Sequence, residues 1–323
     1  MLISPTEPAP VSGLTGRLPS VNPAGRPRRH SLPARAFHGS LNALPWPWGE
    51  KVMAILGVAR GFVHPRRLRR ALGWASHYRH GGADRWRLAL SLLAHDGRFE
   101  ATHSLIGVRD AEQLRAHLDV EGAEHLSRAM EKGGAILLGF HVGPRTSWLA
   151  LRILGFGVNA FIGHDYHRFH RPGLRAVLDS AETVRPQQSD PARRAAWLHR
   201  ARRLLLDGKT VFITADRIIS RDTFEIALPG ATAKVGSGWL ALRQHTGATT
   251  LPVLMHREGR RSVVTIYPPL PPPQPDPVQD MAGCRQALTR ILSDYARRFP
   301  EQCRGLALRL HAILGVLIVL GEA

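Results

Sequence analysis

The sequence predicts an α/β fold, a single α/β sandwich with a largely parallel central sheet flanked by helices. Short apolar runs alternate with helix-like segments through the middle of the chain, from residue 135 to residue 299. Such alternation favours a parallel sheet, because each helix carries the chain back to the start of the next strand. A chain of 323 residues can also bury a large core.

The elements follow in order. Residues 135–140 and 158–162 are apolar runs that predict strands, with a helix at 146–154 between them. Ser189 and Asp190 suit the start of a helix that opens at Pro191 and ends at Gly208. The later pattern predicts strands at 210–214, 249–255 and 262–267, helices at 238–245 and 282–299, and a stiff connector at 268–277.

The two ends of the chain differ from the middle. Residues 1–37 are rich in Pro, Ser, Gly and Arg, which predicts a disordered basic tail. Residues 38–118 are expected to form an N-terminal helical, membrane-facing segment, and 301–323 an apolar C-terminal helix. Within the former, residues 51–63 are apolar and precede a basic cluster, Arg66, Arg67, Arg69 and Arg70. This pattern suits a helix lying on an anionic membrane, and a core helix with a solvated basic end fits equally well.

The charge balance is strongly basic. There are 44 Lys and Arg residues against 25 Asp and Glu, which gives a formal net charge of +19. Such a field attracts nucleic acid, anionic lipid surfaces or acidic carrier proteins, and an arginine-rich composition of the source would produce it too. The 2 cysteines, Cys284 and Cys303, provide no disulfide framework and no zinc spacing.

One histidine stands where open α/β sheets place their chemistry. His141 follows the strand at 135–140 and precedes Gly-Pro, so it should lie at the carboxyl end of that strand. An imidazole fixed at a strand-to-helix turn is well placed to act as a general base.

The surrounding residues resemble a known family. The segment 120–148, VEGAEHLSRAMEKGGAILLGFHVGPRTSW, resembles the active-site entry of the lysophospholipid acyltransferase superfamily. It is most similar to the lipid A biosynthesis (lauroyl/myristoyl) branch, with its V-x-G-x-E-x-L and H-F-G-N-W-E motifs. Residues 209–217, 228–253 and 262–270 resemble later parts of the family pattern in the same order. The resemblance therefore covers about residues 120–300, and it implies an acyltransferase-like domain at 119–300.

The resemblance also implies an activity. Such an enzyme moves a fatty acyl chain from acyl-ACP or acyl-CoA, as co-substrate, to a hydroxyl of a lipid or glycolipid, with no bound cofactor and no metal. The implied place is peripheral, on the cytoplasmic face of the inner membrane. The expected partners are anionic membrane lipids and an acidic acyl carrier protein, and nucleic acid is not expected.

The implied base is His141, and Gly143 matches a family glycine whose missing Cβ would let the backbone approach the reacting carbonyl. The sequence departs from H-x4-D/E at the acid, where Thr146 stands. Three interpretations remain open. Another carboxylate, Asp165 or Asp216, could reach the histidine, or threonine could suffice for a slow or specialised transferase. Alternatively, the site could be inactive and only bind lipid.

Besides Gly143 and Thr146, which are expected to bind substrate, further substrate-binding residues are expected around the base. Asp216 and Arg217 follow the strand at 210–214, where relatives carry an acidic residue facing the acceptor, and Arg217 could pair with a phosphate or simply with its neighbour. Arg145 could bind an anionic headgroup or the carrier's phosphopantetheine, or point to solvent. Gly230 is expected to be a turn glycine first and an acceptor contact second.

Two other functions fit parts of the sequence. His164, Asp165, His167 and His170 have the spacing of a metal site, but the neighbouring Arg168 and Arg171 argue against a cation there. A nucleic-acid binder is conceivable from the charge, yet no helix-turn-helix, zinc or RNA-recognition pattern appears in the sequence. A catalytically impaired, lipid-binding relative of the acyltransferases is the stronger alternative to the enzyme.

Overall fold

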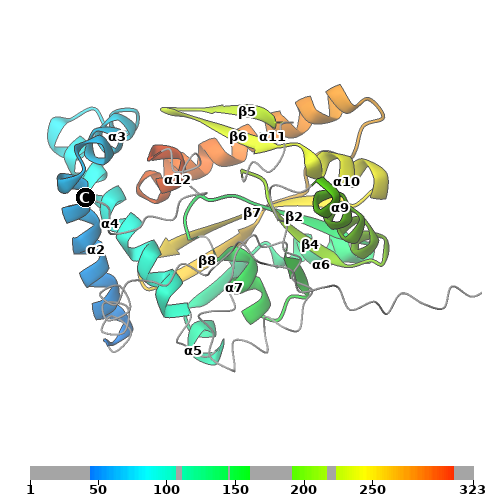
Figure 1. Ribbon diagram of the computed structural model, residues 1–323, viewed down its shortest axis with the longest axis horizontal. Helices are drawn as coiled ribbons and strands as arrows, with labels where there is room; N and C mark the ends of the chain where they lie inside the picture. Colours follow the sequence, from blue (N-terminus) through cyan, green and yellow to red (C-terminus); the bar gives the residue numbers. More distant parts are fainter. Residues whose placement is uncertain (1–43, 107–110, 145, 161–190, 217–222, 309–323) are drawn as a thin grey trace, which may run out of the picture.

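The computed structural model describes residues 44–106, 111–144, 146–160, 191–216 and 223–308. These residues form one mixed α/β unit with helices on both faces of a central sheet (Figure 1). The predicted fold class, a single α/β sandwich with a largely parallel sheet, is confirmed.

The central sheet has six strands in the order β1-β8-β7-β2-β4-β3. All neighbouring strands are parallel except β7 and β8, which are joined by a tight hairpin turn and run antiparallel. The strand β2 lies in the middle, between β7 and β4, so its carboxyl end opens at the centre of the sheet edge. The strands are β1 (Leu118–Glu121), β2 (Ala135–Gly139), β3 (Val158–Ala160), β4 (Thr210–Thr214), β7 (Thr249–Glu258) and β8 (Arg261–Ile266).

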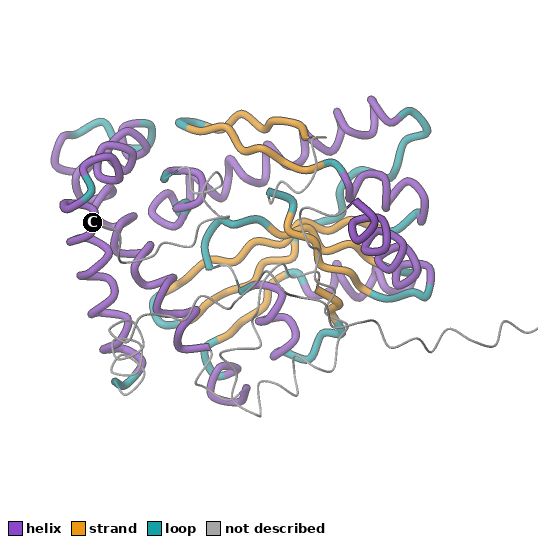
Figure 2. Tube along the Cα trace, in the orientation of Figure 1, coloured by secondary structure: helices purple, strands orange, loops and turns teal. Residues whose placement is uncertain are grey.

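Alternation along the buried strands builds two cores. In β2, Ile136 and Leu138 face one core while Ala135 and Leu137 face the other, because successive side chains of a strand point to opposite sides. Figure 2 shows helices covering both faces. The first core is covered by α9 (Pro191–Leu206), α10 (Gly238–Thr246) and α11 (Pro277–Arg298), and the second by α5 (Ala111–Arg115), α6 (Ala123–Glu131) and α7 (Ser147–Ile153).

Three helices form an extension that we call the helical arm: α2 (Trp46–Val63), α3 (Pro65–Ser76) and α4 (Gly82–Ile106). The arm stands beside the carboxyl end of β7, at the left of Figure 1. The helices α2 and α4 cross at glycines: a Cβ on Gly97 would lie 1.9 Å from the Met53 carbonyl oxygen, and one on Gly57 would lie 2.3 Å from that of Leu93. The two backbones therefore touch, and larger residues at these positions would force them apart.

A second, smaller sheet covers α11. It is the antiparallel hairpin of β5 (Thr223–Leu228) and β6 (Ala231–Gly236), whose inward residues pack on the first core. Its turn contains Gly230 at φ 76°, and a Cβ there would lie 2.4 Å from the ring of His77, which directly follows α3. The tip of the hairpin is thus fastened to the helical arm, as the hydrogen bond from the Tyr78 hydroxyl to the Pro229 carbonyl also shows, at 3.1 Å.

Most of the elements expected between residues 135 and 299 are present, with shifts at their ends. The last long helix begins at Pro277 rather than at residue 282, because Asp276 caps it by accepting a hydrogen bond from the Val278 amide at 3.0 Å. The hairpin β5–β6 was not predicted. After α11 the chain continues through η2 (Pro300–Gln302) and α12 (Arg304–Ala307). The predicted tail 1–37 and most of the predicted helix 301–323 lie outside the described residues.

Candidate active site

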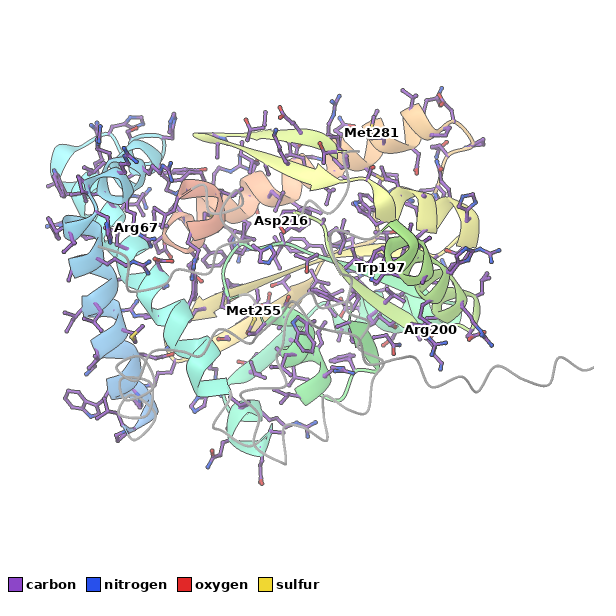
Figure 3. The ribbon with its side chains drawn as sticks, in the orientation of Figure 1. Arg67, Trp197, Arg200, Asp216, Met255 and Met281 are labelled. Carbon is purple, nitrogen blue, oxygen red and sulfur yellow. The ribbon has the colours of Figure 1, made fainter. Side chains whose placement is uncertain are left out.

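His141 and Asp216 meet at the carboxyl ends of two adjacent parallel strands. Gly139 of β2 pairs with Thr214 of β4, and His141 and Asp216 each stand two residues further along. The pairing continues past the strands, since the Ala215 amide donates to the Gly139 carbonyl at 2.9 Å. The sheet register therefore sets the two side chains level with each other. Asp216 lies near the centre of the molecule in Figure 3.

The carboxylate of Asp216 holds the histidine by two hydrogen bonds. Its Oδ1 lies 2.8 Å from His141 Nδ1, and its Oδ2 accepts the His141 backbone N–H at 2.8 Å. The Asp216 side chain is 3% exposed, whereas that of His141 is 17% exposed. Because an ionised carboxylate only accepts hydrogen bonds, the contact assigns the ring proton to Nδ1 and the lone pair to Nε2. This is the tautomer that a general base acting through Nε2 needs.

Thr146 takes no part in this contact. Its side chain is buried, and its hydroxyl donates to the sulfur of Met255 at 3.7 Å. It lines a cleft between α5, α7 and the β7–β8 pair, together with Leu114, Leu149, Met255, Arg257 and Arg260. The partner of the imidazole Nδ1 is therefore Asp216 and not Thr146, and the expected contact of Thr146 with substrate stays a prediction. Of the carboxylates considered from the sequence, Asp216 reaches the ring, and Asp165 lies outside the described residues.

Gly143 has a different role from the expected one. Its φ is 63°, and a Cβ there would lie 1.8 Å from the Met255 carbonyl oxygen and 2.5 Å from the Tyr295 hydroxyl. Its amide donates to the Gln302 carbonyl at 2.9 Å. The space that a Cβ of Gly143 would take is thus already filled by the Met255 carbonyl and the Tyr295 hydroxyl. The glycine is needed for packing, which corrects the expectation that it admits a reacting group.

The other expected substrate-binding residues are placed as follows. Gly230 is a turn glycine in the β5–β6 hairpin, as expected, and its open side faces His77 rather than a ligand site. Arg145 and Arg217 lie outside the described residues, so their contacts with anionic groups stay predictions. The histidine-rich stretch at 164–170 lies there too, and within the described ranges no three His, Cys, Asp or Glu side chains are grouped as a metal site.

Sequence reasoning missed the residues that support the loop carrying His141. The Tyr295 hydroxyl donates to the Met255 carbonyl at 2.9 Å, and burial raises the pKa of Tyr295 well above its usual value, so the hydroxyl keeps its proton. Gln302 accepts the Gly143 amide through its own carbonyl. Both come from the C-terminal part of the chain, and no local motif signals them.

Comparison with known proteins gives few matches. No model of a known protein family matches the chain. No curated protein sequence matches it either. Among solved structures, it is similar to the 1-acyl-sn-glycerophosphate (LPA) acyltransferase PlsC from Thermotoga maritima, at 17% identity and a TM-score of 0.38, over 71% of this chain and 96% of that chain.

Proposed function

We propose that the protein is an acyltransferase that moves a fatty acyl chain from a thioester, acyl-ACP or acyl-CoA, to a hydroxyl of a lipid or glycolipid. The observation that carries the proposal is the His141–Asp216 pair at the carboxyl edge of the sheet. In this pair Asp216 gives His141 a charged partner, which the uncharged Thr146 could not provide. The motif resemblance around residues 120–148 supplies the reaction class.

The chemistry assigns a step to each group. Nε2 of His141 takes the proton from the acceptor hydroxyl as the hydroxyl oxygen attacks the thioester carbonyl carbon. The Asp216 carboxylate stabilises the imidazolium that forms. When the tetrahedral intermediate collapses, the carbon–sulfur bond breaks and the imidazolium returns its proton to the thiolate. The products are the acyl ester and the free thiol, and His141 is again neutral.

The helical arm supports a place at a membrane surface. One side of α2 exposes Trp48, Ile55 and Phe62, which are spaced seven residues apart and so lie along one line of the helix. Exposed arginines follow directly on α3. An apolar stripe beside cations suits a helix that lies in the headgroup layer of an anionic membrane. In the described part of the chain, no helix is both long and apolar enough to cross a bilayer.

Within this proposal, the protein works peripherally on the cytoplasmic face of the inner membrane, where thioester donors are available. Its net charge of +19 favours contact with anionic lipids and with an acidic acyl carrier protein. A lipid A precursor is the acceptor that the motif resemblance favours.

The test is acyl transfer by the full-length protein from radiolabelled lauroyl-ACP and lauroyl-CoA, with a lipid A precursor and lysophosphatidic acid as separate acceptors. We expect labelled ester with at least one donor and acceptor, and its loss in His141→Ala. The variant His77→Ala is the control, because it removes an exposed histidine that packs at Gly230.

The same assay decides between the enzyme and a catalytically impaired lipid-binding protein. Equal label in wild type and His141→Ala would remove His141 from the reaction. Binding of the acceptor without any ester product would favour the lipid-binding alternative.

A further inference from the structure

We propose that Gln302 is a positioning residue for His141, and that it acts from the joint at which the helical arm meets the α/β domain. We call residues 300–304 the joint. The inference rests on the proposed function, because it concerns the geometry of the same histidine. It adds a residue far from the motif and a physical connection between the membrane-facing arm and the chemistry.

Gln302 is bound on three sides. Its side-chain Oε1 accepts the Arg257 amide at 2.8 Å, and its Nε2 donates to the Arg257 carbonyl at 2.9 Å. Its own carbonyl accepts the Gly143 amide at 2.9 Å. The residue is 2% exposed. The side chain thus extends the ladder of β7 as a strand residue would, and it leaves no buried polar atom of the amide without a partner.

These bonds fix one end of the loop that carries the histidine. The His141 amide donates to Asp216, beyond β4, and the Gly143 amide two residues later donates to Gln302. The loop is therefore held on one side by Asp216, which follows β4, and on the other side by Gln302 of η2. A shift of the Gln302 carbonyl would move Gly143, and the contact of Gly143 with the Met255 carbonyl leaves little room to absorb that shift. The ring would then move relative to Asp216.

The joint is also the place where the arm is attached. Asp96 of α4 lies 2.8 Å from Arg304 Nε and also pairs with Arg67 of α3, a residue labelled in Figure 3. The Trp74 indole donates to the Pro300 carbonyl at 2.8 Å. These are charges and donors with little exposure, so their loss would leave buried groups unsatisfied.

A further attachment reaches the same place from α2. Glu50 pairs with the guanidinium of Arg257, the residue whose backbone Gln302 clamps. The helices α3 and α4 therefore contact the joint directly, and α2 contacts Arg257, which is hydrogen-bonded to Gln302 in the joint. A displacement of the arm at a membrane would therefore shift Gln302. Because Gln302 holds the Gly143 amide, the position of His141 would change as well.

The experiment compares Gln302→Met and Gln302→Glu in the full chain. Methionine has similar length and cannot form either bond to Arg257, whereas glutamate retains the acceptor for the Arg257 amide. The control is Asn159→Leu, which removes a side-chain amide of β3 that donates to the Thr210 carbonyl at 3.0 Å. Thr210 is the first residue of β4, so this bond lies at the end of the strand away from Asp216. The readouts are the Nδ1–H resonance of His141 in protein labelled with 15N-histidine, and kcat and KM for the thioester.

We expect Gln302→Met to shift or broaden the His141 resonance and to lower kcat by about tenfold to a hundredfold, with a much smaller change in KM, because a misplaced base costs rate more than binding. Gln302→Glu should fall between wild type and Gln302→Met, and it carries the test if the methionine variant does not fold. Asn159→Leu should leave the resonance unchanged.

Two results would overturn the inference: an unchanged His141 resonance in a folded Gln302 variant, or an equal change in Asn159→Leu. If the wild type transfers no acyl group, the proposed function fails, and the resonance alone then decides whether Gln302 positions the ring.

Discussion

Asp216 binds both the ring and the backbone amide of His141, one carboxylate oxygen to each, at 2.8 Å. The partner of the histidine therefore comes from the neighbouring strand, and not from the turn that the histidine itself begins. A carboxylate that also fixes the backbone orients the ring more firmly than one that contacts the ring alone. This arrangement leads to the first prediction.

Asp216→Asn should lower acyl transfer by at least about a hundredfold in kcat, because an amide cannot stabilise the imidazolium and allows the wrong tautomer. KM should change little. The measurement is steady-state kinetics with the thioester donor. Thr146→Val is the comparison variant, since its hydroxyl contacts Met255 instead, and it should retain most of the activity. Equal losses in the two variants would argue against Asp216 as the orienting acid.

Gly143→Ala should destabilise the protein by more than Gly247→Ala. The two glycines have nearly the same φ, 63° and 66°, so both substitutions carry similar backbone strain. Around Gly247 there is open space, whereas a Cβ on Gly143 would lie 1.8 Å from the Met255 carbonyl oxygen. The difference in midpoint of urea unfolding isolates that clash, and we expect it to correspond to roughly 1–3 kcal/mol. Similar midpoints would show that the loop can move away from β7.

His95 should make stability depend on pH. Burial, followed by the charges of Arg98 and Arg257, lowers the pKa of His95 to about 3, while an unfolded histidine titrates near its usual value of about 6.5. The unfolded chain then binds more protons between these values. The contribution of His95 to stability is full above about pH 6.5 and is lost as the pH falls toward about 3, at up to about 1.4 kcal/mol per pH unit.

The corresponding variant is His95→Gln, which should flatten the dependence of the unfolding midpoint on pH between pH 4 and 6, within the range set by those two pKa values. The variant His80→Gln, at an exposed histidine of the same arm, should leave the dependence as in wild type. An unaltered slope in His95→Gln would show that other groups control acid unfolding.

The apolar stripe of α2 should control membrane binding. Ile55→Asp with Phe62→Asp places two carboxylates on the stripe and should reduce cosedimentation with phosphatidylglycerol vesicles by about tenfold or more, because apolar contact and attraction to anionic lipid are both weakened. Leu206→Asp with Val278→Asp changes the net charge equally at two other exposed apolar residues. That control should bind nearly as well as wild type, and an equal loss in the two double variants would mean that charge alone drives binding.

The alternating core of the domain could be read from the sequence because its signals are local. The strand predicted at 210–214 has the bounds that the structure shows, since TVFIT is a buried run of β-branched and aromatic residues that follows a glycine turn. The hairpin β5–β6 was missed, although its outward and inward residues alternate along both strands.

The sequence predicts the position of the proposed catalytic histidine, but not its partner or the role of the neighbouring glycine. His141 follows its strand directly, so its position at the sheet edge could be inferred. The choice of Asp216 over other carboxylates needed the pairing of Gly139 with Thr214, which is a long-range property of the sheet. The role of Gly143 could not be inferred, because Met255 and Tyr295 approach it from elements more than a hundred residues away in the chain.

The distance along the chain between the two partners has a consequence for how the protein matures. His141 and Asp216 are separated by 75 residues, and they meet only when β2 and β4 are side by side. Parallel strands far apart in sequence pair slowly, because a long loop must close first. Under the proposed function, a newly synthesised chain would therefore acquire its acid–base pair only after the central sheet had assembled.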